Sequence, residues 1–98
     1  MAYEIRWSPE ARDHLATLPA HQRALAVDGV ERHLTGQPDE PSRKRKLLRD
    51  NPLAAWELRL GDLRVFYDVN ENDNAIEVVA VGIKEHNCLR IAGEEFTL

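Results

Sequence analysis

The chain has 98 residues, of which 43% are hydrophobic and 31% are charged. These values are ordinary for a globular protein, so we expect residues 1–98 to form one domain with a modest core. The single cysteine, Cys88, excludes an internal disulfide, and no apolar run approaches the roughly 18 residues of a membrane span. The N-terminus does not read as a signal peptide, and we therefore expect a cytoplasmic protein.

Charge is distributed unevenly along the chain. The formal net charge is −4, yet residues 42–66 carry 7 basic and 3 acidic side chains, a local charge of +4. Salt screens charges over roughly 8–10 Å, so the local sign matters more to a partner than the total does. The basic run Arg43–Lys46 is either a solvated loop or part of a surface for a polyanion.

The first third of the chain predicts a strand followed by two helices. Apolar and polar residues alternate over Tyr3–Trp7, as in a half-buried strand. The sequence SPE at residues 8–10 predicts a helix start with a capping serine, a proline at the first position and an acidic first turn, and Pro19 stops this helix. A second helix is predicted over about Ala20–Thr35, antiparallel to the first. The expected apolar positions are Ala11, Leu15 and Leu18 in the first helix and Leu25, Val27, Val30 and Leu34 in the second.

The rest of the chain predicts a sheet. Residues 37–52 are polar, basic and bounded by proline, which indicates mostly loop. Strands are predicted over Ala55–Leu60, Leu63–Val69 and Ala75–Ile83, and Asn87–Leu98 is expected to be a short extra strand or an appended arm. The order β-α-α-β-β-β predicts an α+β fold with two helices packed on one face of an antiparallel sheet.

The stretch WELRLGDLRVFY, from Trp56 to Tyr67, is the most informative local pattern. A Gly-Asp pair between alternating segments predicts a two-residue β-hairpin loop with Arg59 directly opposite Arg64, and a four-residue loop gives the same pairing. Two like charges facing each other on a sheet are mildly destabilising. The pair is therefore expected to hold an anion, and phosphate is the obvious candidate.

Strand alternation assigns side chains to two sheet faces. The face toward the helices is expected to carry Trp56, Leu58, Leu63, Val65, Tyr67, Val79 and Val81. The other face is expected to carry Glu57, Arg59, Arg64, Phe66, Val78, Ala80, Gly82 and Lys84. The small residues Ala80 and Gly82 should leave a shallow concavity beside Arg64, with three cations at its edge.

Trp56–Val69 and the later VAVGIK segment, Val79–Lys84, resemble the RelE/ParE superfamily of bacterial toxins. The basic segment KLLR at Lys46–Arg49 and the helix start SPEA at Ser8–Ala11 are similar to that family as well, so the resemblance covers nearly the whole chain. It implies the toxin of a type II toxin–antitoxin module, held inactive by a cognate antitoxin. RelE-like members cleave messenger RNA on the ribosome, and ParE-like members poison DNA gyrase. The residues also leave open a non-catalytic module that binds an acidic partner.

The resemblance implies a site for metal-independent RNA cleavage. Arg59, Arg64 and Lys84 would surround the scissile phosphate, and His86 is placed like a catalytic histidine of some members. Cleavage by the ribose 2′-hydroxyl needs a base, an acid and cations for the developing charge. Lys44, Lys46, Arg49 and Phe66 are the expected RNA-binding residues. No cofactor or metal is expected, because His14, His21 and His33 lack partners at ligand spacing.

One residue, the tail and the net charge depart from the family's pattern, since ribosome-dependent members typically have a strongly basic surface and this chain has a net charge of −4. Glu57 stands where several members have a lysine or arginine, and it is either a base or an ion-pair partner of Arg59. The tail reads Cys88–Ile91 where nuclease members commonly have an aromatic residue.

Overall fold

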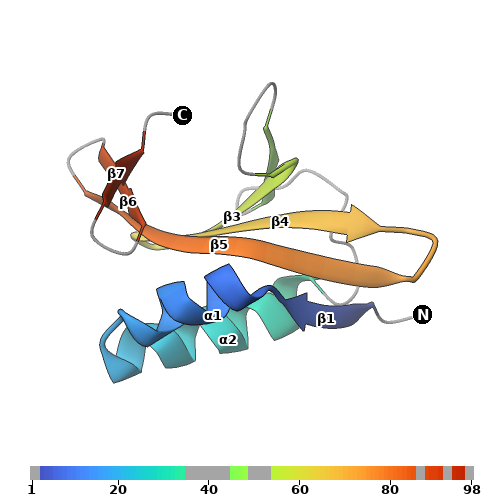
Figure 1. Ribbon diagram of the computed structural model, residues 1–98, viewed down its shortest axis with the longest axis horizontal. Helices are drawn as coiled ribbons and strands as arrows, with labels where there is room; N and C mark the ends of the chain where they lie inside the picture. The colour runs from blue at the N-terminus through green and yellow to red at the C-terminus, as the bar shows by residue number, and fades with distance from the viewer. Residues whose placement is uncertain (1–2, 35–44, 49–53, 86–87, 92–93, 97–98) are drawn as a thin grey trace.

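A computed structural model describes residues 3–34, 45–48, 54–85, 88–91 and 94–96 of the chain. Within these ranges, the helices lie against one side of a curved sheet, and the C-terminal strands rise from its other side (Figure 1). The elements are β1 (Glu4–Trp7), α1 (Pro9–Ala16), α2 (Ala20–Leu34), β2 (Arg45–Leu47), β3 (Trp56–Leu60), β4 (Leu63–Asn70), β5 (Ala75–Glu85), β6 (Cys88–Ile91) and β7 (Glu94–Phe96). The α+β class predicted from the sequence is confirmed.

The sheet has the strand order β2-β3-β4-β5-β6-β7, and each of these neighbouring pairs is antiparallel. The strand β1 lies beside β5 and runs parallel to it, so the sheet is mixed and the expectation of a wholly antiparallel sheet is wrong at this strand. A parallel pair needs a long crossover and has no local turn signal, which is why the sequence does not reveal it. The strand β2 is a second difference from the prediction, because residues 37–52 were expected to be mostly loop.

The helix start at Ser8 forms as predicted. The Ser8 hydroxyl accepts a hydrogen bond from the Ala11 N–H at 3.0 Å, and Pro9 follows at the first helical position. Ser8 also ties α1 to the sheet, because its own N–H donates to the Val78 carbonyl at 3.0 Å. The predicted end of the second helix at Thr35 lies outside the described residues.

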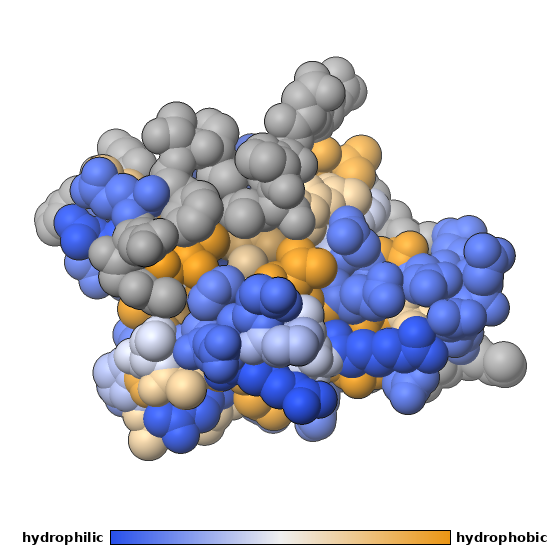
Figure 2. Space-filling view, viewed as in Figure 1, coloured by the Kyte–Doolittle hydropathy of each residue, from blue (hydrophilic) through white to orange (hydrophobic). Residues whose placement is uncertain are grey.

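The main hydrophobic core lies between the helices and the sheet. Its fully buried members include Ala26, Val30 and Leu34 of α2, which follow one helical face. Leu25 is 56% exposed, so its predicted place in the core is wrong. Leu25 precedes Ala26 by one residue, so its side chain is rotated by about 100° around the helix axis from the buried face. Figure 2 shows hydrophilic surface over much of the helical layer, with apolar patches between the helices and the sheet.

A second core cluster fills the opposite face of the sheet. Leu89 and Ile91 of β6 pack with Phe66 and Ala80, and all four are at most 2% exposed. A Cβ atom on Gly82 would lie 2.6 Å from the Arg90 carbonyl oxygen, so glycine allows β6 to approach this closely. The predicted concavity beside Arg64 is therefore covered by β6.

A β-bulge corrects one part of the predicted face assignment. Phe66 pairs with Ala80 but Tyr67 pairs with Val78, which leaves Val79 as an extra residue. Val78 consequently packs in the main core and Val79 packs against the second cluster, the reverse of the expectation. Beyond the bulge, Gly82 pairs with Arg64 as alternation predicted.

The described part of the chain contains no helix that is long and apolar enough to cross a membrane.

Candidate functional site

The β3–β4 hairpin has the predicted register. Leu60 pairs with Leu63 and Arg59 pairs with Arg64 around the two-residue loop Gly61-Asp62. Gly61 has a φ of 62°, in the left-handed region that glycine adopts without steric cost. An added Cβ at Gly61 would meet open space, so glycine is required here for its backbone conformation.

A carboxylate of the chain itself lies between the two facing arginines. Glu57 is only 3% exposed. Its Oε1 atom lies 3.0 Å from Nε of Arg59, in a hydrogen bond, and 3.3 Å from Nε of Arg64. Glu57 occupies the same sheet face as both arginines, two residues before Arg59 and diagonal to Arg64. The like-charge repulsion predicted for the hairpin is thus offset internally.

The two arginines differ in accessibility. The Arg64 side chain is 15% exposed, and its Nη1 donates to the carbonyl oxygens of Gly61 and Leu63 in the turn. Its Nε is buried and has no hydrogen-bond partner in the described structure, because the Glu57 oxygen is near but not aligned. The Arg59 side chain is 40% exposed and is the more accessible cation.

Two lysines flank this cluster on the neighbouring strands. Lys46 of β2 pairs directly with Glu57 and is exposed. Lys84 of β5 is half-buried, and its backbone N–H donates to the Asp62 carbonyl at 2.8 Å, beside the hairpin loop. Adjacent strands therefore bring Lys46, Arg59, Arg64 and Lys84 to one side of the sheet. We call these four residues and Glu57 the hairpin cluster.

Phe66 is a predicted site residue that does not join the hairpin cluster. Phe66 has no exposed surface, so it belongs to the second core cluster and cannot stack on a base in this arrangement. Lys44, Arg49 and His86 lie outside the described residues. The contact between Glu57 and Arg64 was missed, although the hairpin register already placed the two side chains on adjacent diagonal positions.

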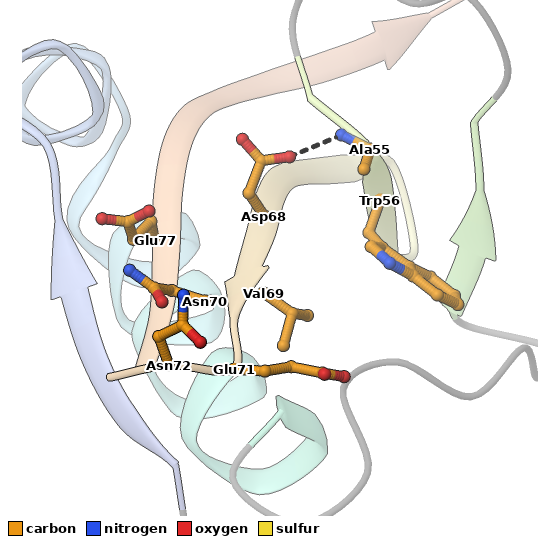
Figure 3. A pocket seen from close by; sticks show the side chains of 8 residues that line it. All are labelled: Ala55, Trp56, Asp68, Val69, Asn70, Glu71, Asn72 and Glu77. Carbon is orange, nitrogen blue, oxygen red and sulfur yellow. Dashed lines mark hydrogen bonds between the residues drawn. The ribbon is translucent and has the colours of Figure 1, made fainter. Parts of the chain in front are cut away.

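A cavity of about 580 Å³ lies near the other end of β4 and has acidic walls. Asp68, Glu71 and Glu77 contribute carboxylates, and Trp56 forms part of one side (Figure 3). One Asp68 oxygen accepts a hydrogen bond from the Ala55 N–H at 2.8 Å. This charge repels a phosphate. The hairpin cluster, not the cavity, is the candidate anion site.

No group of three or more metal-ligating side chains is found among the residues with described positions.

Comparison with known proteins assigns the family. A family model described as the ParE toxin of the type II toxin–antitoxin system parDE matches residues 5–87. The chain belongs to the RelE/ParE toxin superfamily. This confirms the resemblance seen in the hairpin, and the protein is the toxin of a type II toxin–antitoxin module. No curated protein sequence matches the toxin.

Solved structures agree with this assignment. In the toxin–antitoxin complex RelBE2 of Mycobacterium tuberculosis, a chain is 26% identical to the toxin, with a TM-score of 0.68 over 83% of the toxin and 96% of that chain. A mutant of the Escherichia coli toxin RelE in the free state gives 22% identity and a TM-score of 0.68, covering 87% and 86% of the two chains. The archaeal RelE–RelB complex of Pyrococcus horikoshii gives 21% identity and a TM-score of 0.57, covering 88% of the toxin and 99% of that chain. The last two likenesses show the fold alone.

Proposed function

We propose that the toxin is a metal-independent endoribonuclease that cleaves messenger RNA in the cytoplasm and so inhibits translation. The observation that carries this proposal is the convergence of Lys46, Arg59, Arg64 and Lys84 on one side of four adjacent strands. Cations on neighbouring strands suit a polyanionic backbone, because several phosphates can be neutralised together.

The proposed reaction is attack of a ribose 2′-hydroxyl on the adjacent phosphate. The 2′-oxygen loses its proton to a base, the bond from phosphorus to the 5′-oxygen breaks, and that oxygen receives a proton from an acid. The products are a 2′,3′-cyclic phosphate and a 5′-hydroxyl end. Arg59 and Arg64 would hold the charge on phosphorus through their planar forks, with Lys84 as an auxiliary cation.

The acid and base are assigned from the resemblance to the RelE/ParE superfamily. His86 is the proposed proton donor or acceptor, since an imidazole changes charge near neutral pH. Lys46 would bind the RNA backbone from β2, together with Lys44 and Arg49. Glu57 is a poor base in the described conformation, because it is buried and its Oε1 is already shared by two guanidinium groups.

We further propose that a cognate antitoxin binds the toxin and holds it inactive. One of the similar structures, RelBE2 of Mycobacterium tuberculosis, is a toxin–antitoxin complex. It supports a protein partner of the same kind for this chain.

A second candidate function is poisoning of DNA gyrase, the activity of the ParE-like branch. The ion pairs of Glu57 favour it, because they neutralise part of the charge that a nuclease would direct at a phosphate. Burial of Phe66 favours it as well, since no stacking platform remains at that position. In this case the arginines would hold the hairpin together.

Production of the toxin without an antitoxin separates these functions. Pulse-labelling of new protein and new DNA in bacterial cells should show loss of protein synthesis within minutes while DNA synthesis continues. Arg59→Ala, at a more exposed cation, should relieve this inhibition without unfolding the protein. Early loss of DNA synthesis would support the gyrase poison instead, and unaffected growth would support a binding module.

A further inference from the structure

The hairpin cluster holds more positive charge than its single carboxylate can satisfy. Oε1 of Glu57 lies 3.0 Å from Nε of Arg59 and 3.3 Å from Nε of Arg64. Only the Arg59 contact has hydrogen-bond geometry. The buried Nε of Arg64 is left without a hydrogen-bond partner in the described structure. A buried donor without a partner destabilises the fold, so an anion that accepted this hydrogen bond would stabilise the cluster.

The position of Glu57 is the place where an external anion would be bound best. It lies between two guanidinium groups on adjacent strands, and Lys46 pairs with it from the other side. A phosphate approaching Arg59 and Arg64 would meet this carboxylate, and the two negative charges would repel each other in a partly buried environment. It would also have to draw Arg59 out of its hydrogen bond with Glu57.

We propose that Glu57 is a resident counter-ion that occupies the phosphate position of the hairpin cluster and sets the affinity of the toxin for RNA. This inference deepens the proposed function and rests on it for the identity of the ligand. Arg64 is anchored on the turn carbonyls and stays in place, whereas Arg59, at 40% exposure, is the cation that changes partner from Glu57 to the phosphodiester. Residue 57 thus determines the affinity of the site, because its charge decides how strongly the hairpin attracts a phosphate.

The test is the affinity of the purified full-length toxin for a fluorescent 2′-O-methyl oligoribonucleotide, measured by anisotropy at one fixed salt concentration. This probe has ordinary phosphates but cannot be cleaved through its 2′-oxygen. Glu57→Gln keeps the shape of the side chain and one acceptor oxygen, and it removes the charge. It should bind the probe about tenfold more tightly than the parent.

Glu77→Gln is the matched control. It makes the same change in net charge at an exposed residue in the wall of the acidic cavity, and it should change the affinity less than about twofold. Adding Arg59→Ala to Glu57→Gln should abolish the gain. Thermal unfolding checks that each variant is folded. If Glu57→Gln does not fold, Glu57→Asp, which retracts the carboxylate by one methylene, should give a smaller gain of about threefold.

Equal affinities of the parent and a folded Glu57 variant would overturn the inference. So would equal gains from Glu57→Gln and Glu77→Gln, because these would reflect net charge alone. The measurement does not depend on cleavage. If the toxin blocks DNA synthesis but still shows the Glu57 effect, the proposed function is wrong and the role of Glu57 as a counter-ion stands. If the toxin cleaves RNA but shows no Glu57 effect, the proposed function stands and the counter-ion role is wrong.

Discussion

Glu57 and His14 are two side chains whose contacts link separate strands or layers of the fold. The facing of Arg59 and Arg64 was predictable, because the Gly61-Asp62 loop fixes the register locally. Pairing of Glu57 with Arg59 was one of two roles open from the sequence, and the ion pair is present. Its sharing with Arg64 and its deep burial were not predictable, because they depend on side-chain conformation and on β2, which was expected to be loop.

His14 makes the stability of the fold depend on pH. Its Nδ1 accepts a hydrogen bond from the Val81 N–H at 3.2 Å, which requires the neutral ring. Burial lowers the pKa of His14 below its ordinary value of 6.5, and the nearby carboxylates of Asp13 and Glu10 oppose this only in part. The unfolded chain therefore takes up a proton first as the pH falls, so stability is full above about pH 7 and declines as the pH falls through 6.5.

His14→Asn tests this linkage. The asparagine oxygen can replace Nδ1 as the acceptor but does not titrate, so the variant should stay within about 1 kcal/mol of the parent at pH 7.5. Its stability should fall less than that of the parent between pH 7.5 and 5.5, as measured by urea unfolding. The control is His21→Asn at an exposed position of α2. Parallel pH profiles of the parent and His14→Asn would contradict the assigned role.

At the scale of elements, structure that depends on neighbouring residues was predicted correctly, whereas pairings between distant segments were not predicted. The α1 start at Ser8 and the β3–β4 hairpin follow from residues within a few positions of each other. The parallel β1–β5 pair, the bulge at Val79 and the position of β6 over the second cluster each depend on residues far apart in sequence. The predicted faces of Val78 and Val79 were exchanged because strict alternation assumes a strand without an extra residue, and the bulge inserts one.

Gly82 should be the residue that allows β6 to lie so close to the sheet. An alanine methyl there would lie 2.6 Å from the Arg90 carbonyl oxygen, a backbone atom that cannot rotate away. Gly82→Ala should cost about 1–3 kcal/mol of unfolding free energy and speed hydrogen exchange at the amides of β6. Gly61→Ala is the control, with a cost of about 1–2 kcal/mol from backbone strain alone. Unchanged exchange in β6 with Gly82→Ala would show that β6 does not depend on this contact.

For the molecule as a whole, charge and topology act together. The chain is acidic overall, with a net charge of −4, yet adjacent strands gather Lys46, Arg59, Arg64 and Lys84 on one side. The acidic cavity lies toward the opposite end of β4. A polyanion should therefore be oriented by attraction at the hairpin cluster and repulsion at the cavity. The family could be predicted from the hairpin pattern and the α+β fold from the order of the predicted elements, but the ion pair of Glu57 with Arg64 could not.

Mapping of RNA 5′-hydroxyl ends tests the central claim most directly. Cells that produce the toxin without an antitoxin should accumulate new 5′-hydroxyl ends within messenger RNA coding regions in the first minutes. Cells that produce equal amounts of folded Arg59→Ala or Arg64→Ala toxin should show few of them, with end counts reduced at least about tenfold for the loss of one phosphate-binding donor. Growth arrest by the parent without new 5′-hydroxyl ends, or the same ends with both arginine variants, would contradict RNA cleavage at the hairpin cluster.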